Sequence, residues 1–371
     1  MTIYVLYSAD YELYLGGNYC DETEVLINPT NNLLNLFENL NIPLTLFADV
    51  FSIACYKKHS LFNFPDNAEN QLKDAIRRGH DVQAHVHPHW NYTRIEGNTY
   101  KFDINYFLLG NLADNKEELY SKIRTCLMTS RTYLNNLINQ VDKNYHCIAF
   151  RAGGYGLQPN SDIVIKALID SGFIIDTSIV PDSIFKSNAN EIDFSIVPKM
   201  ANYYLEYDLH TPSDNNQGIF EIPIASCTFN IMETSFHQIT ILLTFFQNKT
   251  FHRKLPGSFT KEKGYTILQS ENKPRHSKYY NFLKAFNDRF YYLDCSTNVE
   301  KMFQCTKKYL NRFDYINKNI FFSVNMHPKE MTKEHCNALE NYHNKLKDYY
   351  KDNIQAISYQ QAAEMVAKKP L

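Results

Sequence analysis

Four of the 13 histidines fall within the ten-residue segment 80–89, which reads His-Asp-Val-Gln-Ala-His-Val-His-Pro-His. Imidazole nitrogen is the commonest side-chain ligand of metal ions near neutral pH. His85 and His89 are four residues apart, so both could reach one ion if the chain turns after the strand that precedes them. His87 would share their face only if that strand continued, which Pro88 disfavours. Because three alternating histidines are costly to bury unless something ligates or neutralises them, the segment predicts a metal site in preference to a solvated loop.

A pair of acids, Asp10 and Glu12, follows the first predicted strand at residues 3–7. The side chains of acids two residues apart at the end of a strand can point to the same side of the sheet, where one could ligate a metal ion and the other could act as a base. Acids in loops after strands are usually solvated, so the pair alone carries little weight. Together with the histidines, it predicts the acidic part of a metal site.

Arg151 opens a glycine-rich segment, Arg-Ala-Gly-Gly-Tyr-Gly, directly after an apolar strand. A guanidinium in that position needs a carboxylate or a substrate as its partner. The glycines let backbone N–H groups approach a ligand closely, as an oxyanion hole requires. Such a segment would also form an ordinary tight turn, and without the other motifs that is the simpler interpretation.

Two further polar residues stand at the ends of predicted strands: Asp176, followed by Thr177 and Ser178, and His327, followed by a proline. A lone histidine at a strand end is usually structural. Five strand ends that each carry a polar residue favour a functional site instead, because the active sites of parallel barrels lie at the carboxyl ends of their strands. The set predicts a site with one metal ion and an Asp/Glu–Arg–His group.

The elements that must position these residues alternate along the chain, with short β-branched or aromatic runs between helical patterns. This order is typical of repeated β–α units around a largely parallel sheet. The predicted strands lie at 3–7, 44–48, 81–85, 147–150, 173–175, 219–224, 320–324 and 354–357. Six helices are predicted: one that begins at Thr30, one that ends at Gly79, one over 119–138, one that begins at Asn160 or Ser161, one over 299–310, and one that begins at Thr332. The pattern favours one α/β domain over residues 1–371 with a largely parallel sheet, and single α/β barrels with insertions reach this length.

The region 226–315 breaks this rhythm with a basic, aromatic stretch at 249–263 and the predicted helix at 299–310. No linker rich in Pro, Gly or Ser flanks it, so we expect an insertion on the barrel. Its basic residues could bind an anionic group such as a pyrophosphate, although a solvated basic face is the simpler interpretation. These residues are Lys261, Lys263, Arg275 and His276.

Composition narrows the class of protein. The 371 residues are 44% hydrophobic and 21% charged, and 38 basic residues against 40 acidic ones give a net charge of −2. No strong field would draw the chain to nucleic acid or to an anionic membrane. The eight scattered cysteines form no C-x-x-C pair and indicate reduced thiols. Without a basic leader or an apolar run near the ~18 residues of a membrane span, we expect a cytoplasmic protein with no transmembrane segment.

In this order, the motifs resemble those of the polysaccharide deacetylase (NodB-homology) family, also called carbohydrate esterase family four. The resemblance covers roughly residues 1–225 and 316–368, with the run at 219–223 similar to a strand of the family, and it implies the family's distorted (β/α) barrel. It implies that His85 and His89 bind a divalent metal, usually Zn²⁺. Asp10 would be the base that activates water, and Arg151 would hold and tune it.

The remaining roles implied by the resemblance belong to three residues. The backbone N–H near Tyr155 would bind the oxyanion, His327 would be the general acid, and Asp176 would orient or support His327. Tyr11 stands where the family usually has a metal-binding aspartate, so the third ligand is Glu12 or Asp10 itself. Threonine and serine follow Asp176, where the family usually has tryptophan.

The resemblance implies a hydrolase that removes an N-acetyl or other acyl group from a sugar. Because the sequence shows no export signal, the expected carbohydrate is a cytoplasmic precursor: a nucleotide-linked or lipid-linked sugar, or an oligosaccharide intermediate of surface glycan synthesis. Three alternatives stay open. The first is hydrolysis of another C–N bond, in a formamide or a ureide ring. The second is a catalytically silent carbohydrate-binding relative, and the third is an unrelated metal-binding structural protein.

Overall fold

The computed structural model describes residues 1–14, 21–97, 99–187, 189–235 and 289–368. Its main sheet has nine strands in the order β10-β11-β7-β6-β3-β2-β1-β14, with β15 also paired to β1. These strands are β1 (Ile3–Tyr11), β2 (Thr45–Asp49), β3 (Asp81–Val86), β6 (Ala149–Ala152), β7 (Ile175–Asp176), β10 (Tyr203–Leu205), β11 (Ile219–Glu221), β14 (Ile320–Met326) and β15 (Ile354–Ala356). All neighbouring pairs are parallel except β10 with β11.

The sheet curls until its two ends meet. Ser323 of β14 donates its N–H to the carbonyl of Pro223, and Ala225 donates to the carbonyl of Ser323, so the chain just after β11 pairs with β14. The architecture is therefore a distorted (β/α) barrel, as the family resemblance implies, and its largely parallel sheet agrees with the alternating elements.

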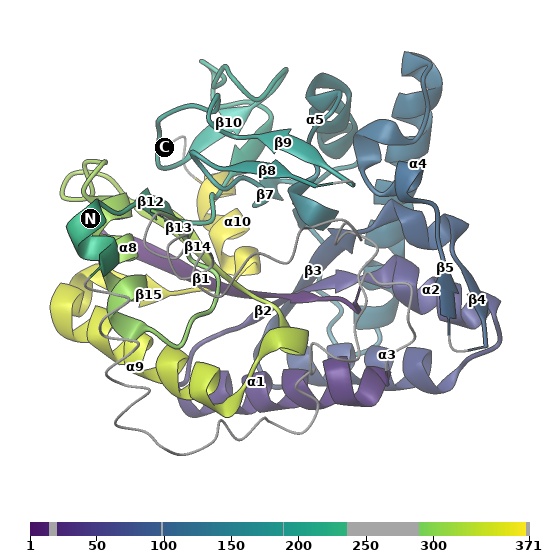
Figure 1. Cartoon of the computed structure of the whole chain (residues 1–371), viewed down its shortest axis with the longest axis horizontal. Coiled ribbons are helices and arrows are strands. Elements are labelled where there is room, and N and C mark those ends of the chain that lie inside the picture. The colour runs from purple at the N-terminus through teal and green to yellow at the C-terminus, as the bar shows by residue number, and fades with distance from the viewer. Residues whose placement is uncertain (15–20, 98, 188, 236–288, 369–371) are drawn as a thin grey trace.

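Helices cover the outside of the barrel, with α1, α3 and α9 along one side in Figure 1. The helices are α1 (Asn28–Asn39), α2 (Val50–Lys58), α3 (Asn63–Arg77), α4 (Lys116–Ile138), α5 (Ser161–Asp170), α8 (Val299–Leu310), α9 (Lys333–Tyr350) and α10 (Tyr359–Lys368). Single turns of other helix types are η1 (Thr23–Ile27), η2 (Pro88–Tyr92), η3 (Ile104–Tyr106), η4 (Leu109–Asn111), η5 (Gly153–Tyr155), η6 (Pro328–Glu330) and η7 (Lys351–Asn353). Among the described residues, no helix is both long and apolar enough to cross a bilayer.

In the described part of the chain, three two-stranded ribbons accompany the main sheet: β4 (Arg94–Glu96) with β5 (Thr99–Lys101), β8 (Ile184–Lys186) with β9 (Glu191–Asp193), and β12 (Ser226–Thr228) with β13 (Phe290–Tyr292). Strands β12 and β13 flank the centre of the expected insertion, and the predicted helix at 299–310 is confirmed as α8. The stretch 249–263 and the basic residues at 261, 263, 275 and 276 lie outside the described residues.

One predicted helix start differs from the structure. Thr30 is a buried residue inside α1, because the helix begins earlier and continues directly from the turn η1. The start predicted at Asn160 or Ser161 is confirmed, since α5 begins at Ser161, but Asn160 adopts a left-handed conformation and makes no capping hydrogen bond with its side chain. Thr332, by contrast, caps α9 as predicted and forms a capping box with His335.

The barrel interior changes from apolar to polar along its axis. Because side chains alternate along a strand, every second residue of β1 points inward: Leu6, Ser8, Asp10 and then Glu12. Leu6 belongs to an apolar cluster with Phe321 of β14 and with α10, which fills one end of the barrel. Along β1, the polar and charged residues therefore lie toward the carboxyl end of the strand, where a parallel barrel places its active site.

Candidate active site

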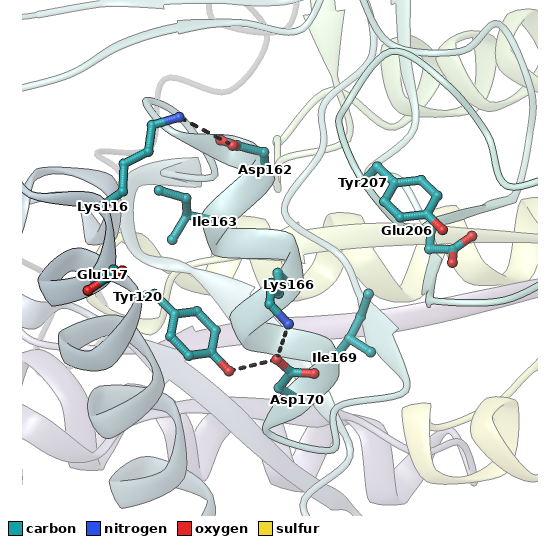
Figure 2. Close-up of a pocket in the computed structure, with 10 residues that line it drawn as sticks. All are labelled: Lys116, Glu117, Tyr120, Asp162, Ile163, Lys166, Ile169, Asp170, Glu206 and Tyr207. Atoms are coloured by element: carbon teal, nitrogen blue, oxygen red, sulfur yellow. Dashed lines mark hydrogen bonds and ion pairs between the residues drawn. The ribbon is translucent and has the colours of Figure 1, made fainter.

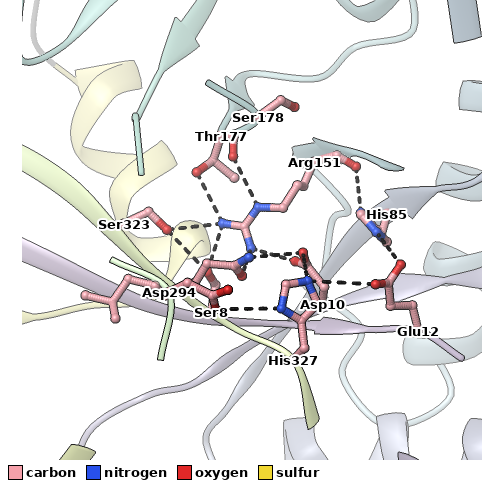
Figure 3. A network of polar contacts seen from close by, with 12 residues as sticks. Ser8, Asp10, Glu12, His85, Arg151, Thr177, Ser178, Asp294, Ser323 and His327 are labelled. Carbon is pink, nitrogen blue, oxygen red and sulfur yellow. Dashed lines mark hydrogen bonds and ion pairs between the residues drawn. The ribbon is translucent and has the colours of Figure 1, made fainter. Parts of the chain in front are cut away.

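Arg151 lies at the centre of the site and is completely buried. Its guanidinium donates to groups on several strands (Figure 3): Asp10 Oδ1 at 2.7 Å, Asn325 Oδ1 at 2.7 Å, Ser8 Oγ at 2.8 Å, Ser323 Oγ at 3.1 Å and the carbonyl of Thr177 at 3.1 Å. A planar guanidinium with five N–H donors can satisfy such a ring of acceptors, which a lysine could not. Arg151 therefore fixes the relative positions of the strand ends that carry the site.

Asp10 is held as a carboxylate by the groups around it. Besides Arg151, Asn325 Nδ2 donates to its Oδ2 at 3.2 Å, and Nε2 of His327 lies 3.3 Å from the same oxygen. Burial alone would raise the pKa of Asp10, but Arg151, His85 and His327 hold that pKa well below its usual range. The carboxylate is therefore ionised at neutral pH and faces the pocket with a defined orientation.

His327 lies between two carboxylates. Its Nε2 faces Asp10, and its Nδ1 lies 3.7 Å from Oδ1 of Asp294. Burial would lower the pKa of His327, but these two acids raise it well above its usual value. The ring can therefore carry a proton at neutral pH, which a general acid requires.

The structure does not bring Asp176 to His327, since no hydrogen bond or ion pair joins these two described residues. Asp176 instead accepts hydrogen bonds from the hydroxyl and the N–H of Ser178, and it pairs in register with Glu221 on β11. Burial raises the pKa of both carboxyl groups, and that of Glu221 lies well above its usual range. Asp294, just after β13, lies in the position beside His327 that the family resemblance implied for Asp176.

Glu12, His85 and His87 form a compact set of donor atoms. One oxygen of Glu12, Oε2, lies 3.2 Å from Nε2 of His85 and 2.5 Å from Nε2 of His87. The three ligand atoms lie within 4.8 Å of one another, and all three side chains are buried. Asp10, the alternative third ligand, lies outside this set and is bound by Arg151.

The hydrogen bonds of His85 test whether a cation fits this set. Its Nδ1 lies 2.9 Å from the carbonyl oxygen of Arg151 and so must carry a proton. In the neutral ring, Nε2 then turns a lone pair toward Glu12 Oε2, and two acceptors face each other at 3.2 Å. Burial would lower the pKa of His85, but Asp10 and Glu12 raise it. Both observations indicate that positive charge is favoured between His85 and Glu12, so the donor set fits a metal ion.

His89 does not join this set. Its ring is buried among those of Trp90, Phe102 and Phe107, at centroid distances of 5.0–5.4 Å, and among the described residues neither of its nitrogens has a hydrogen-bond partner. Burial lowers its pKa well below the usual value. The reason is local geometry: the chain stays extended through His87 (φ −108°, ψ 94°) and turns only at Pro88. Alternation along the strand therefore places His85 and His87, two residues apart, on the same face.

The turn Gly153–Tyr155 packs against this cluster. A Cβ atom on Gly153 would lie 2.5 Å from Nδ1 of His87 and 2.6 Å from the carbonyl oxygen of Val86, so only glycine fits. Gly154 and Tyr155 both adopt positive φ, 59° and 60°. The turn thus brings its backbone to the rim of the site, and it presents the Tyr155 hydroxyl 3.4 Å from Asn325 Nδ2.

A pocket of about 330 Å³ opens over these groups. Asp10, Glu12, His85, His87 and His327 line its polar side, and Phe107, Tyr155, Phe185 and Tyr292 line its aromatic side. The rings of Tyr155 and Phe185 are stacked, with centroids 5.0 Å apart. A larger surface groove lies between α4 and α5, where Asp170 binds Lys166 and Tyr120 (Figure 2), but it contains none of the strand-end residues.

Sequence reasoning missed several residues of the site. Asp49 lies fully buried at the end of β2, opposite His85 in the register, and burial raises its pKa to about 7. Its position after a predicted strand was the available signal. Lys329 comes directly after the His327–Pro328 motif and Asp294 follows no motif, and only the fold brings these two residues to Glu12 and His327.

No protein-family model matches the sequence, and no curated protein matches it either. Solved structures similar to the chain include a putative polysaccharide deacetylase from Mycobacterium smegmatis, with 14% identity and a TM-score of 0.45 over 100% of this chain and 92% of that one. Puue allantoinase has 12% identity and a TM-score of 0.46 over 99% and 91% of the two chains. A probable polysaccharide deacetylase from Pseudomonas aeruginosa PAO1 has 11% identity and a TM-score of 0.45 over 99% and 92%. Polysaccharide deacetylases are thus among the structural neighbours of the whole chain, at low sequence identity.

Proposed function

We propose that the protein is a metal-dependent hydrolase that removes an acyl group, most simply N-acetyl, from a sugar. One observation carries the proposal: the donor set Glu12–His85–His87 lines the same pocket as Asp10 and His327. A metal site alone has many uses. A metal site beside an ionised carboxylate and a protonated imidazole has the parts that hydrolysis of an amide requires.

Glu12, His85 and His87 would hold the ion through one oxygen and two nitrogens. Three protein ligands of this kind, with a position left open, are typical of catalytic Zn²⁺. When bound, such an ion polarises the acyl carbonyl and makes water acidic enough to lose a proton near neutral pH.

Asp10 would accept the proton of the attacking water. Its carboxylate lies at the pocket surface and is ionised, and Arg151 and Asn325 hold it in place. The attack would turn the carbonyl oxygen into an oxyanion. The backbone N–H near Tyr155 would donate a hydrogen bond to that oxygen, and the position of its turn at the pocket rim supports this role.

His327 would donate a proton to the departing amine. Asp10 and Asp294 raise the pKa of the ring, so the acidic form is present at neutral pH, and the ring lies beside the carboxylate that accepts the first proton. Removing a general acid typically lowers the rate by roughly 10²–10⁴-fold.

The aromatic side of the pocket supports a sugar as substrate. Phe107, Tyr155, Phe185 and Tyr292 line the pocket together with its polar groups. A pocket lined by aromatic rings and a few fixed polar groups suits a molecule that has both apolar and polar surface, as a sugar ring with an acetamido group does.

The test is release of acetate by the full-length protein, stripped with a chelator and then supplied with Zn²⁺. Substrates are N-acetylated sugars, N-formylated sugars and cyclic ureides, with the His327→Asn variant as control. We expect acetate release that requires metal and that falls by about 10²–10⁴-fold in the variant. Turnover of the formylated sugars or the ureides alone would show that the protein hydrolyses a formamide or a ureide bond instead of an acetamide bond. Failure to bind zinc or to turn over any substrate would reject the proposal.

A further inference from the structure

Lys329 places a buried ammonium group directly behind the proposed metal site. It lies in the turn η6, two residues after His327, and its residue is only 7% exposed. Its Nζ donates to Glu12 Oε1 at 2.6 Å and to the carbonyl oxygen of Leu13 at 3.2 Å. A charged amine this deeply buried is costly unless it is paired, so its contact with Glu12 is a fixed part of the site.

The contact divides the two oxygens of Glu12 between different partners. Oε1 is bound by Lys329, whereas Oε2 faces the Nε2 atoms of His85 and His87. A carboxylate held in this way offers an ion one oxygen rather than two. Lys329 therefore fixes both the rotation of Glu12 and its number of available ligand atoms.

The same contact changes the charge that an entering ion meets. Lys329 already balances Glu12, and Arg151 already balances Asp10. A divalent ion bound at Oε2 would have the ammonium group of Lys329 on the other oxygen of the same carboxylate, where like charges repel strongly in a poorly solvated site. Without Lys329, Glu12 would be a buried carboxylate lacking its closest counter-charge and would gain more from the ion.

We propose that Lys329 is a positioning residue that holds Glu12 as a one-oxygen ligand and, by its charge, weakens the binding of divalent metal ions. The proposal rests on the metal site of the proposed function. It predicts that loss of Lys329 raises the affinity for divalent metal ions. If Lys329 were only a structural support for Glu12, its loss would lower that affinity.

The test compares the zinc affinity of the full-length protein and its variants by competition with a chromophoric chelator. We expect Lys329→Met to bind Zn²⁺ at least about tenfold more tightly than the wild type, and its metal-free form to melt at a lower temperature, because Glu12 loses its counter-charge. Lys329→Arg keeps the charge and should bind zinc much as the wild type does. Lys333→Met removes the same charge from a nearby exposed position and should leave the affinity unchanged.

A second neutral variant, Lys329→Gln, guards against misfolding of the methionine variant, because its amide can still donate to Glu12 and to the carbonyl of Leu13. It should also bind zinc more tightly. If the wild type binds zinc and both neutral variants bind it equally or more weakly, the role of Lys329 is rejected while the metal site stands. If neither the wild type nor any variant binds zinc, the metal site and the role of Lys329 both fail.

Discussion

Asp294 Oδ1 lies 3.7 Å from Nδ1 of His327, while Asp10 Oδ2 lies 3.3 Å from the other nitrogen of the same ring. The ring is therefore held from both sides by carboxylates that come from distant parts of the chain. Asp10 comes from the first strand, and Asp294 follows β13 and forms a bridge with Asn325 of β14. Asp176, to which the family resemblance gave this role, instead accepts a hydrogen bond from Ser178, two residues further along the chain.

The first prediction concerns Asp294→Asn. Because Asp294 raises the pKa of His327, its loss should lower that pKa. The His327 ring would then lose its proton at a lower pH, and the alkaline limb of the kcat/KM profile should move to lower pH. We expect kcat to fall by about 10–100-fold, as for other groups that orient a functional imidazole. Asp176→Asn is the matched control. A profile that moves with Asp176→Asn and not with Asp294→Asn would contradict this assignment.

The second prediction separates the two candidate histidine ligands. His87→Gln should lower zinc affinity by more than about 100-fold, since it removes a direct ligand rather than a supporting group. His89→Gln should leave zinc affinity nearly unchanged, because the His89 ring lies among Trp90, Phe102 and Phe107. Zinc content measured by elemental analysis after dialysis against graded chelator compares the two. The reverse result would restore the pair His85 and His89.

The third prediction concerns the glycine beneath His87. A methyl group in Gly153→Ala would lie 2.5 Å from His87 Nδ1, so the imidazole must move. Overpacking typically costs ~1–3 kcal/mol of stability, and here zinc affinity should fall as well. In Gly172→Ala, at a position with φ +79°, the methyl group would instead meet the guanidinium of Arg131 at 3.0 Å. That control should lose stability without losing zinc affinity, and equal zinc affinities would show that Gly153 does not position His87.

The fourth prediction is a pH dependence of stability. Glu221 has a pKa well above its usual range in the folded protein, through burial and its neighbour Asp176. The folded state therefore keeps a proton that the unfolded state loses above about pH 4.3, so stability falls as pH rises, by at most about 1.4 kcal/mol per pH unit for one proton. Glu221→Gln should remove this loss. Urea unfolding at pH 5 and pH 8 measures the change in the free energy of unfolding between these two pH values. Glu340→Gln, at an exposed position, is the control. The same change in the wild type and in both variants would contradict the prediction.

The sequence predicted the strands of the main sheet other than β10, because their apolar runs are short and bounded by polar residues. Strand ends were sufficient to single out Asp10, Arg151 and His327. Helix α2 was missed because it is buried around most of its circumference, from Val50 to Tyr56, and shows no apolar stripe. His87 was passed over because Pro88 was expected to end the strand, whereas the extended chain continues up to Pro88.

Lys329 and Asp294 could not be predicted from local pattern. Each touches a site residue that is far away in the sequence, Glu12 in one case and His327 in the other. Only closure of the barrel, which brings β14 beside β1, makes these contacts possible. Residues that act through another side chain rather than through a motif need the fold before they can be found.

The most direct test of the central claim is a crystal structure of the zinc-loaded protein with anomalous scattering measured at the zinc edge. We predict one strong peak at ligand distance, about 2.0–2.2 Å, from Glu12 Oε2, His85 Nε2 and His87 Nε2, with Lys329 still on Oε1. A peak bound by His89 or by Asp10 in place of these atoms, or no peak inside the pocket, would contradict the account.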